Sequence, residues 1–302
     1  MSHAGVLELD GRKGLIRRVH LEEDTGKLVH AGDKLHMAKE SFVDLNRAGI
    51  PLMEIVSEPD LHSADEARDY AVALRTLLRT IGASEAEMEK GQLREEPNIS
   101  IRRAGDKELG VKTELRNIKP FRALHRAIQF EVARQVELLE SGGTVEQETR
   151  GWSEAEQRTF SQRSKEFAED YRYFPEPDLP PLELDPTWIE GLRAALPEMP
   201  GARRSRLISE YGLPAADADQ ITADVNLANL FDATVKGGVP PRQAANWLIR
   251  AAAAAGQLPH AEGRSVFVEG VPGGNITTAH GAAVLRGASA RRTGLDRRSA
   301  GP

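Results

Sequence analysis

The chain has 302 residues, of which 40% are hydrophobic and 28% charged, and its formal net charge is −6. This length suggests about two domains, and the composition is that of a globular protein with a sizeable core. No apolar run approaches the roughly 20 residues that span a membrane, and the first residues lack an export pattern. We therefore predict a cytoplasmic protein with no membrane partner. The absence of cysteine excludes disulfides, thiolate zinc sites and a cysteine nucleophile.

The charge is unevenly distributed along the chain. From His260 onward six arginines accompany three acidic residues, so this tail is basic and the preceding body is strongly acidic. Such a body cannot attract nucleic acid through its overall field, although local basic patches still can.

A strand and a helix are predicted in the first 85 residues, besides the strand-like run at 51–58. Residues 14–22 are typical of a strand, and Gly26 and Gly32 mark turns after it. Ser63 followed by Glu66 has the spacing of a helix capping box. An apolar stripe follows this pair and predicts a helix that ends at Gly82.

Two alternating segments, 98–102 and 111–116, are predicted to pair as an antiparallel hairpin around Gly105. Each has one polar face, which carries Asn98, Ser100 and Arg102 in the first segment and Lys112, Glu114 and Arg116 in the second. This face is either a solvated outer surface or a sheet floor that presents groups to a ligand.

The rest of the chain changes from mixed to helical character. A helix is predicted from Pro120 to Leu139, then a short strand at 145–150 and an extended proline-dense loop at 171–181. Short helices are expected at 188–196, 203–211, 224–235 and 241–255. The composition after Gly256 predicts disorder. The expected fold is α+β with a mainly antiparallel sheet in residues 1–185, an all-helical domain at 186–256 and a disordered tail at 257–302.

Glu54 is the most informative single position, because it interrupts the apolar, strand-like run 51–58. A charge there requires a metal, a cation or a hydrogen-bond donor, unless the side chain leans into water or forms an internal ion pair. The other acidic candidates are Glu22, Glu23, Asp24 and Glu58. Carboxylates from separate strands suit magnesium, although a run of three acids is more often solvated surface. His20 should share a strand face with Glu22.

Standard nucleotide and hydrolase motifs are absent. The sequence has no Walker or Rossmann glycine loop, no nucleophile elbow and no HExxH pattern. Any nucleotide chemistry would therefore need a sheet-and-metal site. Arg94, Arg102, Lys112 and Arg116 are candidates for neutralising phosphate charge.

Several ordered segments together carry a family resemblance that reaches from about residue 14 to about residue 248. They are Arg18-Val19-His20-Leu21-Glu22-Glu23-Asp24-Thr25-Gly26-Lys27, Val43-Asp44-Leu45-Asn46-Arg47-Ala48-Gly49, Pro51-Leu52-Met53-Glu54-Ile55-Val56-Ser57-Glu58-Pro59-Asp60, Lys112-Thr113-Glu114-Leu115-Arg116-Asn117, Gln147-Glu148-Thr149-Arg150 and residues 170–181. In these segments the chain closely resembles the B subunits of the aspartyl/glutamyl-tRNA amidotransferases, the GatB family.

The resemblance implies a catalytic, kinase-type cradle domain similar to the glutamine synthetase core, followed by helical and tail domains. It implies an ATP- and Mg²⁺-dependent ligase that takes its amide from glutamine and acts in protein biosynthesis. The partners would be the amidase (A) and small (C) subunits of a heterotrimer, with mischarged Glu-tRNA(Gln) or Asp-tRNA(Asn) as substrate. Positioning and charge neutralisation at the transferred phosphoryl group fit this chemistry.

The resemblance also implies roles for individual residues. The metal ligands would be Glu22, Glu23 and Glu54, and of these Glu23 and Glu54 are the catalytic candidates, with Glu22 as the alternative to Glu23. Four further residues would contact substrate or nucleotide: Arg94, Asn98, Glu114 and Asn117.

The chain departs from the family pattern at one internal signature. Where the family reads Leu-Arg-Cys-Asp-x-Asn-[Val/Ile]-Ser, this chain reads Leu93-Arg94-Glu95-Glu96-Pro97-Asn98-Ile99-Ser100. Glu96 replaces the shorter aspartate and Pro97 removes a backbone donor, so a changed local geometry is expected here.

The family's front metal-ligand segment, zinc knuckle and tail domain are also not found in the sequence. We therefore expect a product truncated at both ends, with no zinc and with an aberrant tail that suits a wrong reading frame. A rival hypothesis is a non-catalytic remnant that binds partner subunits or tRNA. A free-standing ligase for a small substrate is a weaker one.

Overall fold

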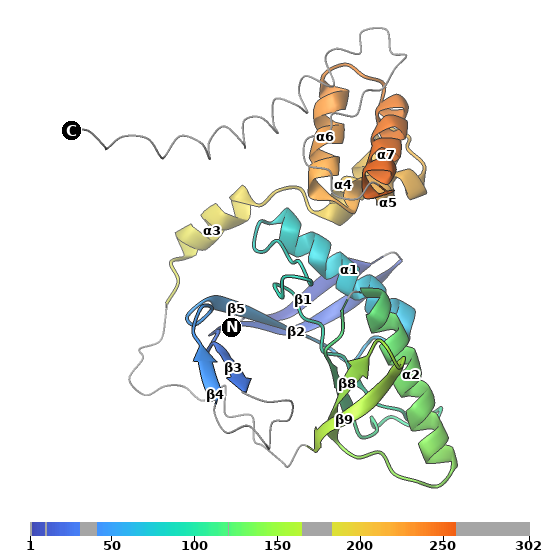
Figure 1. The fold of residues 1–302 in the computed structure, drawn as a ribbon. Coiled ribbons are helices and arrows are strands. Elements are labelled where there is room, and N and C mark those ends of the chain that lie inside the picture. The colour runs from blue at the N-terminus through green and yellow to red at the C-terminus, as the bar shows by residue number, and fades with distance from the viewer. Residues whose placement is uncertain (1, 10, 31–40, 120, 165–182, 258–302) are drawn as a thin grey trace, which may run out of the picture. The chain divides into compact units, whose positions relative to one another are not determined.

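The computed structural model describes residues 2–9, 11–30, 41–119, 121–164 and 183–257. The chain forms two compact units, residues 1–194 and residues 195 onward (Figure 1). The predicted loop at 171–181 and the predicted disordered tail, from residue 258 onward, lie outside the described residues.

The first unit begins with an antiparallel sheet in the order β1 (Ser2–Leu9), β2 (Arg12–Glu23), β5 (Pro51–Ser57). The strand predicted at 14–22 is confirmed within β2, whereas β1 was not anticipated. His20 lies opposite Glu54 and Val19 opposite Ile55, with a register irregularity between Ile16 and Arg18. Side chains alternate between the faces of a sheet, so this bulge decides which residues of β2 face which way.

Helix α1 (Ala64–Thr80) covers one face of this sheet (Figure 1). Ser63 Oγ accepts a hydrogen bond from the Glu66 N–H at 3.1 Å, as the capping box predicts. The Glu66 carboxylate accepts from the His62 N–H at 2.6 Å, one residue before the usual cap position. A Cβ on Gly14 would lie 2.7 Å from the Tyr70 ring, so glycine is required for the close approach of helix and sheet.

A second hairpin, β3 (Lys27–His30) and β4 (Ser41–Asp44), follows β2 and is antiparallel. The turn at its base is tied to β2 through Asp24. The Asp24 N–H donates to the Ile50 carbonyl at 2.9 Å and the Gly49 N–H donates to the Asp24 carbonyl at 2.8 Å. The Asp24 carboxylate lies 3.1 Å from the Arg47 guanidinium. Asp24 therefore has a structural role.

The other large sheet has the order β6 (Asn98–Ile99), β7 (Thr113–Arg116), β8 (Glu148–Ser153), β9 (Arg158–Ser164). The predicted pairing of the 98 and 113 segments is confirmed, in shorter strands than expected. The strand predicted at 145–150 is shifted three residues later, and β9 was missed. The pair β7–β8 is parallel, so this sheet is mixed.

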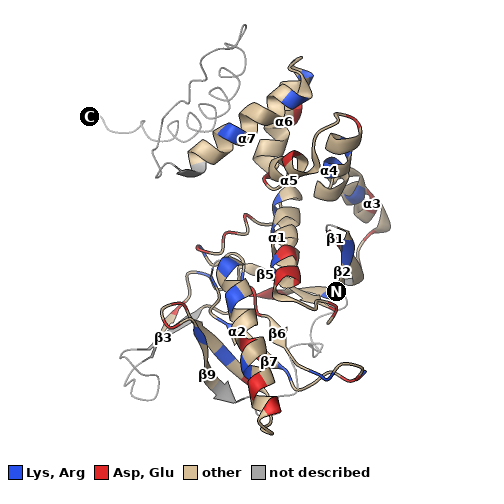
Figure 2. Ribbon diagram, turned by 90° about the vertical axis from the view of Figure 1, so that its right-hand side faces the viewer, with Lys and Arg blue, Asp and Glu red and all other residues tan. Residues whose placement is uncertain are grey.

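Helix α2 (Phe121–Glu140) packs on this sheet, and the core between them includes Leu115, Leu124, Ile128 and Trp152. Figure 2 shows basic residues near the start of α2 and acidic residues near its end. This is the reverse of what the helix dipole favours. Contacts with the sheet must therefore stabilise α2.

Those contacts include a buried polar network centred on Glu131, which is fully buried. Arg134 donates to both carboxylate oxygens of Glu131 at 2.9 and 2.6 Å, and Thr159 and Gln135 each donate at 2.9 Å. Gln135 also donates to Thr113 Oγ1 at 3.2 Å. The network joins α2 to β7 and β9 and satisfies a charge that would otherwise be costly to bury.

The second unit is helical. It contains α4 (Pro200–Ser209), α5 (Ala215–Thr222), α6 (Val225–Lys236) and α7 (Pro241–Gln257), and α3 (Pro186–Ala195) lies at the end of the first unit. Four helices match the predictions, whereas the short α5 was missed. Phe231, Ile221 and Leu207 are fully buried in the core. Within the described ranges no helix has the length and apolarity needed to cross a bilayer.

An ion cluster joins α4 to α6 in this unit. Arg203 and Arg206 both bond the Asp232 carboxylate, at distances down to 2.5 and 3.0 Å, and Arg206 also bonds Glu198 at 2.7 Å. The hydrogen bonds that Arg206 donates to Glu198 and Asp232 raise the pKa of Arg206. Burial alone would raise the pKa of Asp232, but the two guanidinium groups lower it.

We predict that Glu131→Ala destabilises the first unit by about 3–5 kcal/mol at pH 7, because buried donors lose their acceptor. Burial alone would raise the pKa of Glu131, but hydrogen bonds from Arg134 and Gln135 lower it. Its stabilising contribution should therefore be complete above the unfolded pKa and be lost as pH falls through the folded pKa. The wild type should lose this part of its free energy of unfolding at acid pH. The variant lacks the contribution at every pH and should not lose it.

The measurement is urea unfolding followed by Trp152 fluorescence, with Trp188 and Trp247 replaced by Phe so that the first unit alone reports. Glu137→Ala, at an exposed position of the same helix, is the matched control and should change stability by no more than about 0.5 kcal/mol. Equal losses in both variants would contradict a specific role for the network.

Candidate functional site

Glu54 lies on the face of the β1–β2–β5 sheet opposite α1. Its Oε2 is 2.8 Å from His20 Nε2. The His20 side chain is 9% exposed and that of Glu54 34% exposed, so the pair lies at the border of the protein interior. The Glu54 carboxylate in the apolar strand β5 is therefore paired with His20 of β2. Glu54 remains accessible to solvent and to a ligand.

The strand register separates Glu22 from Glu23. Glu22 lies opposite Leu52 and His20 opposite Glu54, which places Glu22, His20 and Glu54 on one face. Glu23 lies opposite Pro51 and belongs to the other face. Both glutamates are exposed. The preferred pair, Glu23 with Glu54, therefore lies on opposite faces of the sheet, whereas the alternative, Glu22, shares the face of Glu54.

Another of the acidic candidates has a structural partner. Arg17 donates to Glu58 at 2.7 Å, and this hydrogen bond lowers the pKa of Glu58. Asp60 accepts a hydrogen bond from the Leu15 N–H at 2.8 Å. The Glu58 N–H donates to the Leu15 carbonyl at 2.8 Å. The segment after β5 thus folds back on the bulge of β2, and Glu58 helps to hold it there.

The donor groups of the described segments limit the kind of metal site that the chain can form. Among the described residues, no three or more acidic or histidine side chains lie together so that they could hold a metal ion. Magnesium, however, is commonly held by one or two carboxylates together with water and substrate phosphates. Glu54 and Glu22 fit that partial role, and they do not form a cage that would bind the ion alone.

A second polar cluster forms where β6 pairs with β7. Asn98 lies opposite Glu114 in the register, and Arg116 Nε donates to Glu114 Oε1 at 2.5 Å. A second nitrogen of Arg116 lies 3.4 Å from the Glu96 carboxylate. Glu114 is only 7% exposed, whereas Asn98 is exposed. This polar face is therefore neither wholly solvated nor closed, because a buried carboxylate lies beside an accessible amide.

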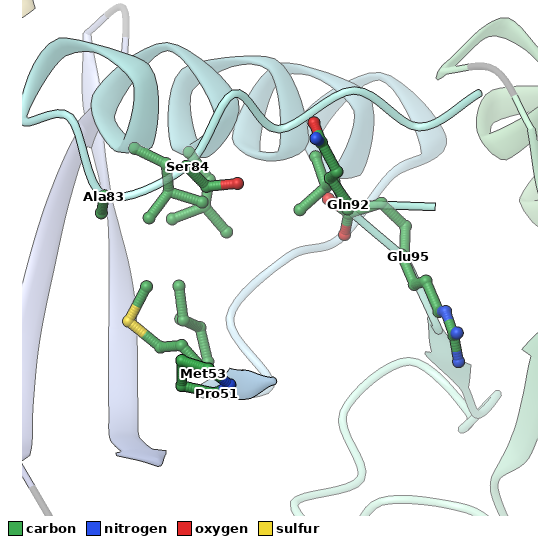
Figure 3. Close-up of a pocket in the computed structure, with 11 residues that line it drawn as sticks. Pro51, Met53, Ala83, Ser84, Gln92 and Glu95 are labelled. Carbon is green, nitrogen blue, oxygen red and sulfur yellow. The ribbon is translucent and has the colours of Figure 1, made fainter. Parts of the chain in front are cut away.

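Arg94 and Asn117 lie outside both clusters. Arg94 is exposed and lines a pocket on the α1 side of the first sheet (Figure 3). Asn117 is exposed just after β7 and has a φ of 62°, in the left-handed region. Asparagine tolerates this conformation better than most residues. Its local role at the end of β7 can therefore be conformational as well as ligand-binding.

Comparison with known proteins identifies the family. Residues 1–190 match the model of the GatB/GatE catalytic domain. The B subunit of an aspartyl/glutamyl-tRNA(Asn/Gln) amidotransferase from Carboxydothermus hydrogenoformans is 49% identical over 245 residues, which cover 80% of this chain and 51% of the relative. The chain belongs to the GatB family.

Other relatives agree in name and extent. The B subunit from Roseiflexus sp. strain RS-1 is 49% identical over 252 residues, covering 81% of this chain and 51% of the relative. That from Rippkaea orientalis is 50% identical over 240 residues, covering 79% and 48%. This chain thus spans about half the length of the curated relatives it matches. The region matched to the GatB model contains both polar clusters.

Two features of the GatB region were missed by sequence reasoning. One is the Glu131 network; its signal was that Glu131 and Gln135 continue the apolar stripe of Leu124 and Ile128, so polar residues occupy core positions. The other is Glu95, whose pKa burial raises to about 7. No periodicity marks that position, because it lies between elements.

We predict that substitutions at Asn117 separate conformation from ligand binding. Asn117→Gly should preserve stability, since glycine adopts positive φ readily, and Asn117→Val should lower it by about 1–2 kcal/mol. The measurements are urea unfolding and the activity of the assembled complex. If Asn117→Gly keeps full activity, a side-chain contact with substrate is excluded; if activity falls while stability is kept, that contact is supported.

Proposed function

We propose that this GatB-family chain is the ATP-using component of a tRNA-dependent amidotransferase that acts in the cytoplasm. The substrate is Glu or Asp esterified to tRNA(Gln) or tRNA(Asn). The observation that carries the proposal is the match of residues 1–190 to the GatB/GatE catalytic domain, supported by relatives named as the B subunit of that enzyme. The proposal includes a cradle similar to the glutamine synthetase core, with the strand face of Glu54 lining the cradle.

The proposed reaction has two transfers. The side-chain carboxylate of the esterified amino acid attacks the γ-phosphorus of ATP, and the bond to the β-phosphate oxygen breaks, which yields an acyl phosphate and ADP. Ammonia from glutamine, released by the partner amidase (A) subunit, then attacks the acyl carbon and phosphate leaves. The small (C) subunit would complete the heterotrimer. The protein contributes positioning and charge neutralisation to such phosphoryl transfers.

The described residues suggest a division of labour. Glu54, with Glu22 or Glu23, would hold Mg²⁺ against the nucleotide phosphates, and the ion would offset phosphate charge. His20, at 2.8 Å from Glu54 Oε2, would fix the orientation of that carboxylate. Arg94, Asn98, Glu114 and Asn117 are proposed to contact the substrate or nucleotide.

A second candidate function is that of a non-catalytic protein that binds partner subunits or tRNA. The observation that favours it is that the described residues form no three-ligand metal group. The ATP-using function requires ATP turnover by the assembled complex, whereas the binding-only function excludes it.

We predict that the chain, mixed with the amidase and small partner subunits and with Glu-tRNA(Gln) or Asp-tRNA(Asn), releases ADP in a tRNA-dependent manner. Glu54→Gln should lower that rate at least about a hundredfold, the scale for losing one group that stabilises transition-state charge. Glu8→Gln, at an exposed position of the same sheet, is the control and should remain active. If saturating magnesium gives no turnover in the wild-type mixture, the binding-only function is the correct one.

We predict further that Glu22→Gln raises the magnesium concentration needed for half-maximal ADP release by about tenfold or more, and that Glu23→Gln does not. The reason is the register, which places Glu22 and not Glu23 on the Glu54 face. A magnesium titration of each variant at fixed ATP measures this. The reverse outcome would identify Glu23 as the ligand and would require the strand to shift by one residue.

A further inference from the structure

The face of the mixed sheet that points away from α2 carries an exposed aromatic side chain, that of Phe160. Thr159 of β9 donates to Glu131 of α2, so the next residue, Phe160, belongs to the opposite face. Phe160 is 41% exposed. A large apolar ring therefore lies on the same face as the polar cluster of Glu114 and Arg116.

Packing within the sheet explains only part of this ring. Phe160 pairs with Gly151 of β8, and a Cβ on Gly151 would lie 2.6 Å from the ring atom Cζ and 2.7 Å from Gln162 Nε2. Both side chains therefore extend over the glycine. Such a cross-strand pair of an aromatic ring with glycine stabilises a sheet. The exposed part of the Phe160 ring remains free to contact a ligand.

A bulge places an amide group beside the ring. Arg150 lies opposite Ser161, and the preceding residue of β8 lies opposite Arg163. Gln162 is therefore the extra residue of β9. Bulges are frequent beside functional sites, where they redirect a side chain. Gln162 is exposed, and its amide can both donate and accept hydrogen bonds.

A cation borders the other side of Gly151. Arg116 of β7 lies opposite Gly151 in the parallel pair β7–β8, and its side chain is 38% exposed. Glu114 and Glu96 hold the guanidinium, at 2.5 and 3.4 Å, so its position is fixed before any ligand binds. The Arg116–Gly151–Phe160 strip thus crosses three strands, with a cation at one end and an aromatic ring at the other.

This strip lies on the same side of the first unit as Glu54. Helices α1 and α2 pack against each other, since Ala71 of α1 belongs to the core of α2 and His125 lies 3.3 Å from Asp65. The two helices form one layer, and both sheets lie on the same side of it (Figures 1 and 2). Glu54 and Phe160 are each on the sheet face that points away from the helices. The strip therefore shares one side of the unit with the carboxylates proposed to hold Mg²⁺.

The chemistry of the strip suits a planar, hydrogen-bonding ring that is attached to an anion. Nucleotide bases stack on aromatic side chains, and a glutamine amide matches the adjacent donor and acceptor groups of adenine. Guanine presents two acceptors on that edge, so the same amide matches it less well. The Arg116 cation favours attached phosphate. An aliphatic ligand would use neither the amide nor the guanidinium.

We propose that Phe160 and Gln162 form a binding subsite for the adenine ring of an adenosine nucleotide, with Arg116 on the phosphate side. The ring would stack on the accessible part of Phe160, and the Gln162 amide would bond its edge. Adenine occurs in both proposed substrates, ATP and the 3′-terminal adenosine of tRNA. The inference rests on the proposed function and adds to it the residues that select the base.

The test uses the full chain assembled with the amidase and small subunits. Phe160→Leu keeps an apolar side chain over Gly151 but removes the aromatic face. It should raise one KM about tenfold, the scale of losing one stacked base, with kcat unchanged. A higher KM for ATP identifies ATP as the source of the ring, and a higher KM for aminoacyl-tRNA identifies the tRNA end. Phe160→Tyr should keep the wild-type KM. Phe42→Leu, the same change at an exposed position of β4, is the control and should alter neither KM.

Gln162→Glu gives a second arm, because it replaces an amide that donates and accepts with a group that only accepts. The preference for adenine over guanine, measured as a ratio of kcat/KM values, should fall about tenfold. The pairs compared are ATP with GTP, and tRNA ending in adenosine with tRNA ending in guanosine. An unchanged ratio for both pairs would exclude the proposed role of Gln162.

Direct binding separates this inference from the proposed function. Equilibrium dialysis of the full chain with ATP and Mg²⁺, or with aminoacyl-tRNA, measures binding without turnover. If the wild type turns over ATP and Phe160→Leu and Gln162→Glu both behave like it, the subsite is wrong and the proposed function stands. If the wild type binds neither substrate and shows no turnover, both are overturned. An equal loss of activity and of urea stability in Phe160→Leu and Phe160→Tyr would show that the ring serves packing alone.

Discussion

The pairing of β2 with β5 is the constraint on which the proposed site around Glu54 depends. Because side chains alternate along a strand, a slip of one residue would move Glu54 to the α1 face and Met53 and Ile55 into solvent. The register is held from both ends. Asp60 and Glu58 bond the backbone of Leu15 at one end, and Asp24 bonds Ile50 at the other. These residues position the site without touching a ligand.

Local signals in the sequence predicted the helices well, because their causes are local. Ser63 with Glu66 caps α1, and the pattern from Pro241 predicted α7. The strands were harder, since β9 and the parallel β7–β8 pair arise from contacts between distant segments. The family resemblance indicated both Glu22 and Glu23. The face each occupies depends on a bulge near Arg17, which no periodicity in the sequence reveals.

The buried glutamates show why burial alone does not define a role. Glu131 has the lowered pKa of a carboxylate surrounded by donors. Glu131 accepts from Thr159 of β9 and from Gln135, which donates to Thr113 of β7, so the pair joins α2 to two strands of the sheet. Glu95 has a raised pKa because burial acts without donors. The first arrangement is complete within the protein and therefore structural. The second leaves Oε1 of Glu95 without a hydrogen-bond partner among the described residues.

The departures from the family signature at Glu96 and Pro97 leave the pairing of β6 with β7 intact. Pro97 has no N–H, but pairing uses its carbonyl, which accepts from the Leu115 N–H at 2.9 Å. Glu96 is longer than the family's aspartate and lies 3.4 Å from Arg116. The pairing of β6 with β7 that places Asn98 opposite Glu114 is therefore retained. The remaining departure, Glu95 in place of cysteine, falls in the pocket. The chain thus differs from the signature most where a carboxylate replaces a small neutral side chain, next to Arg94, which lines the same pocket.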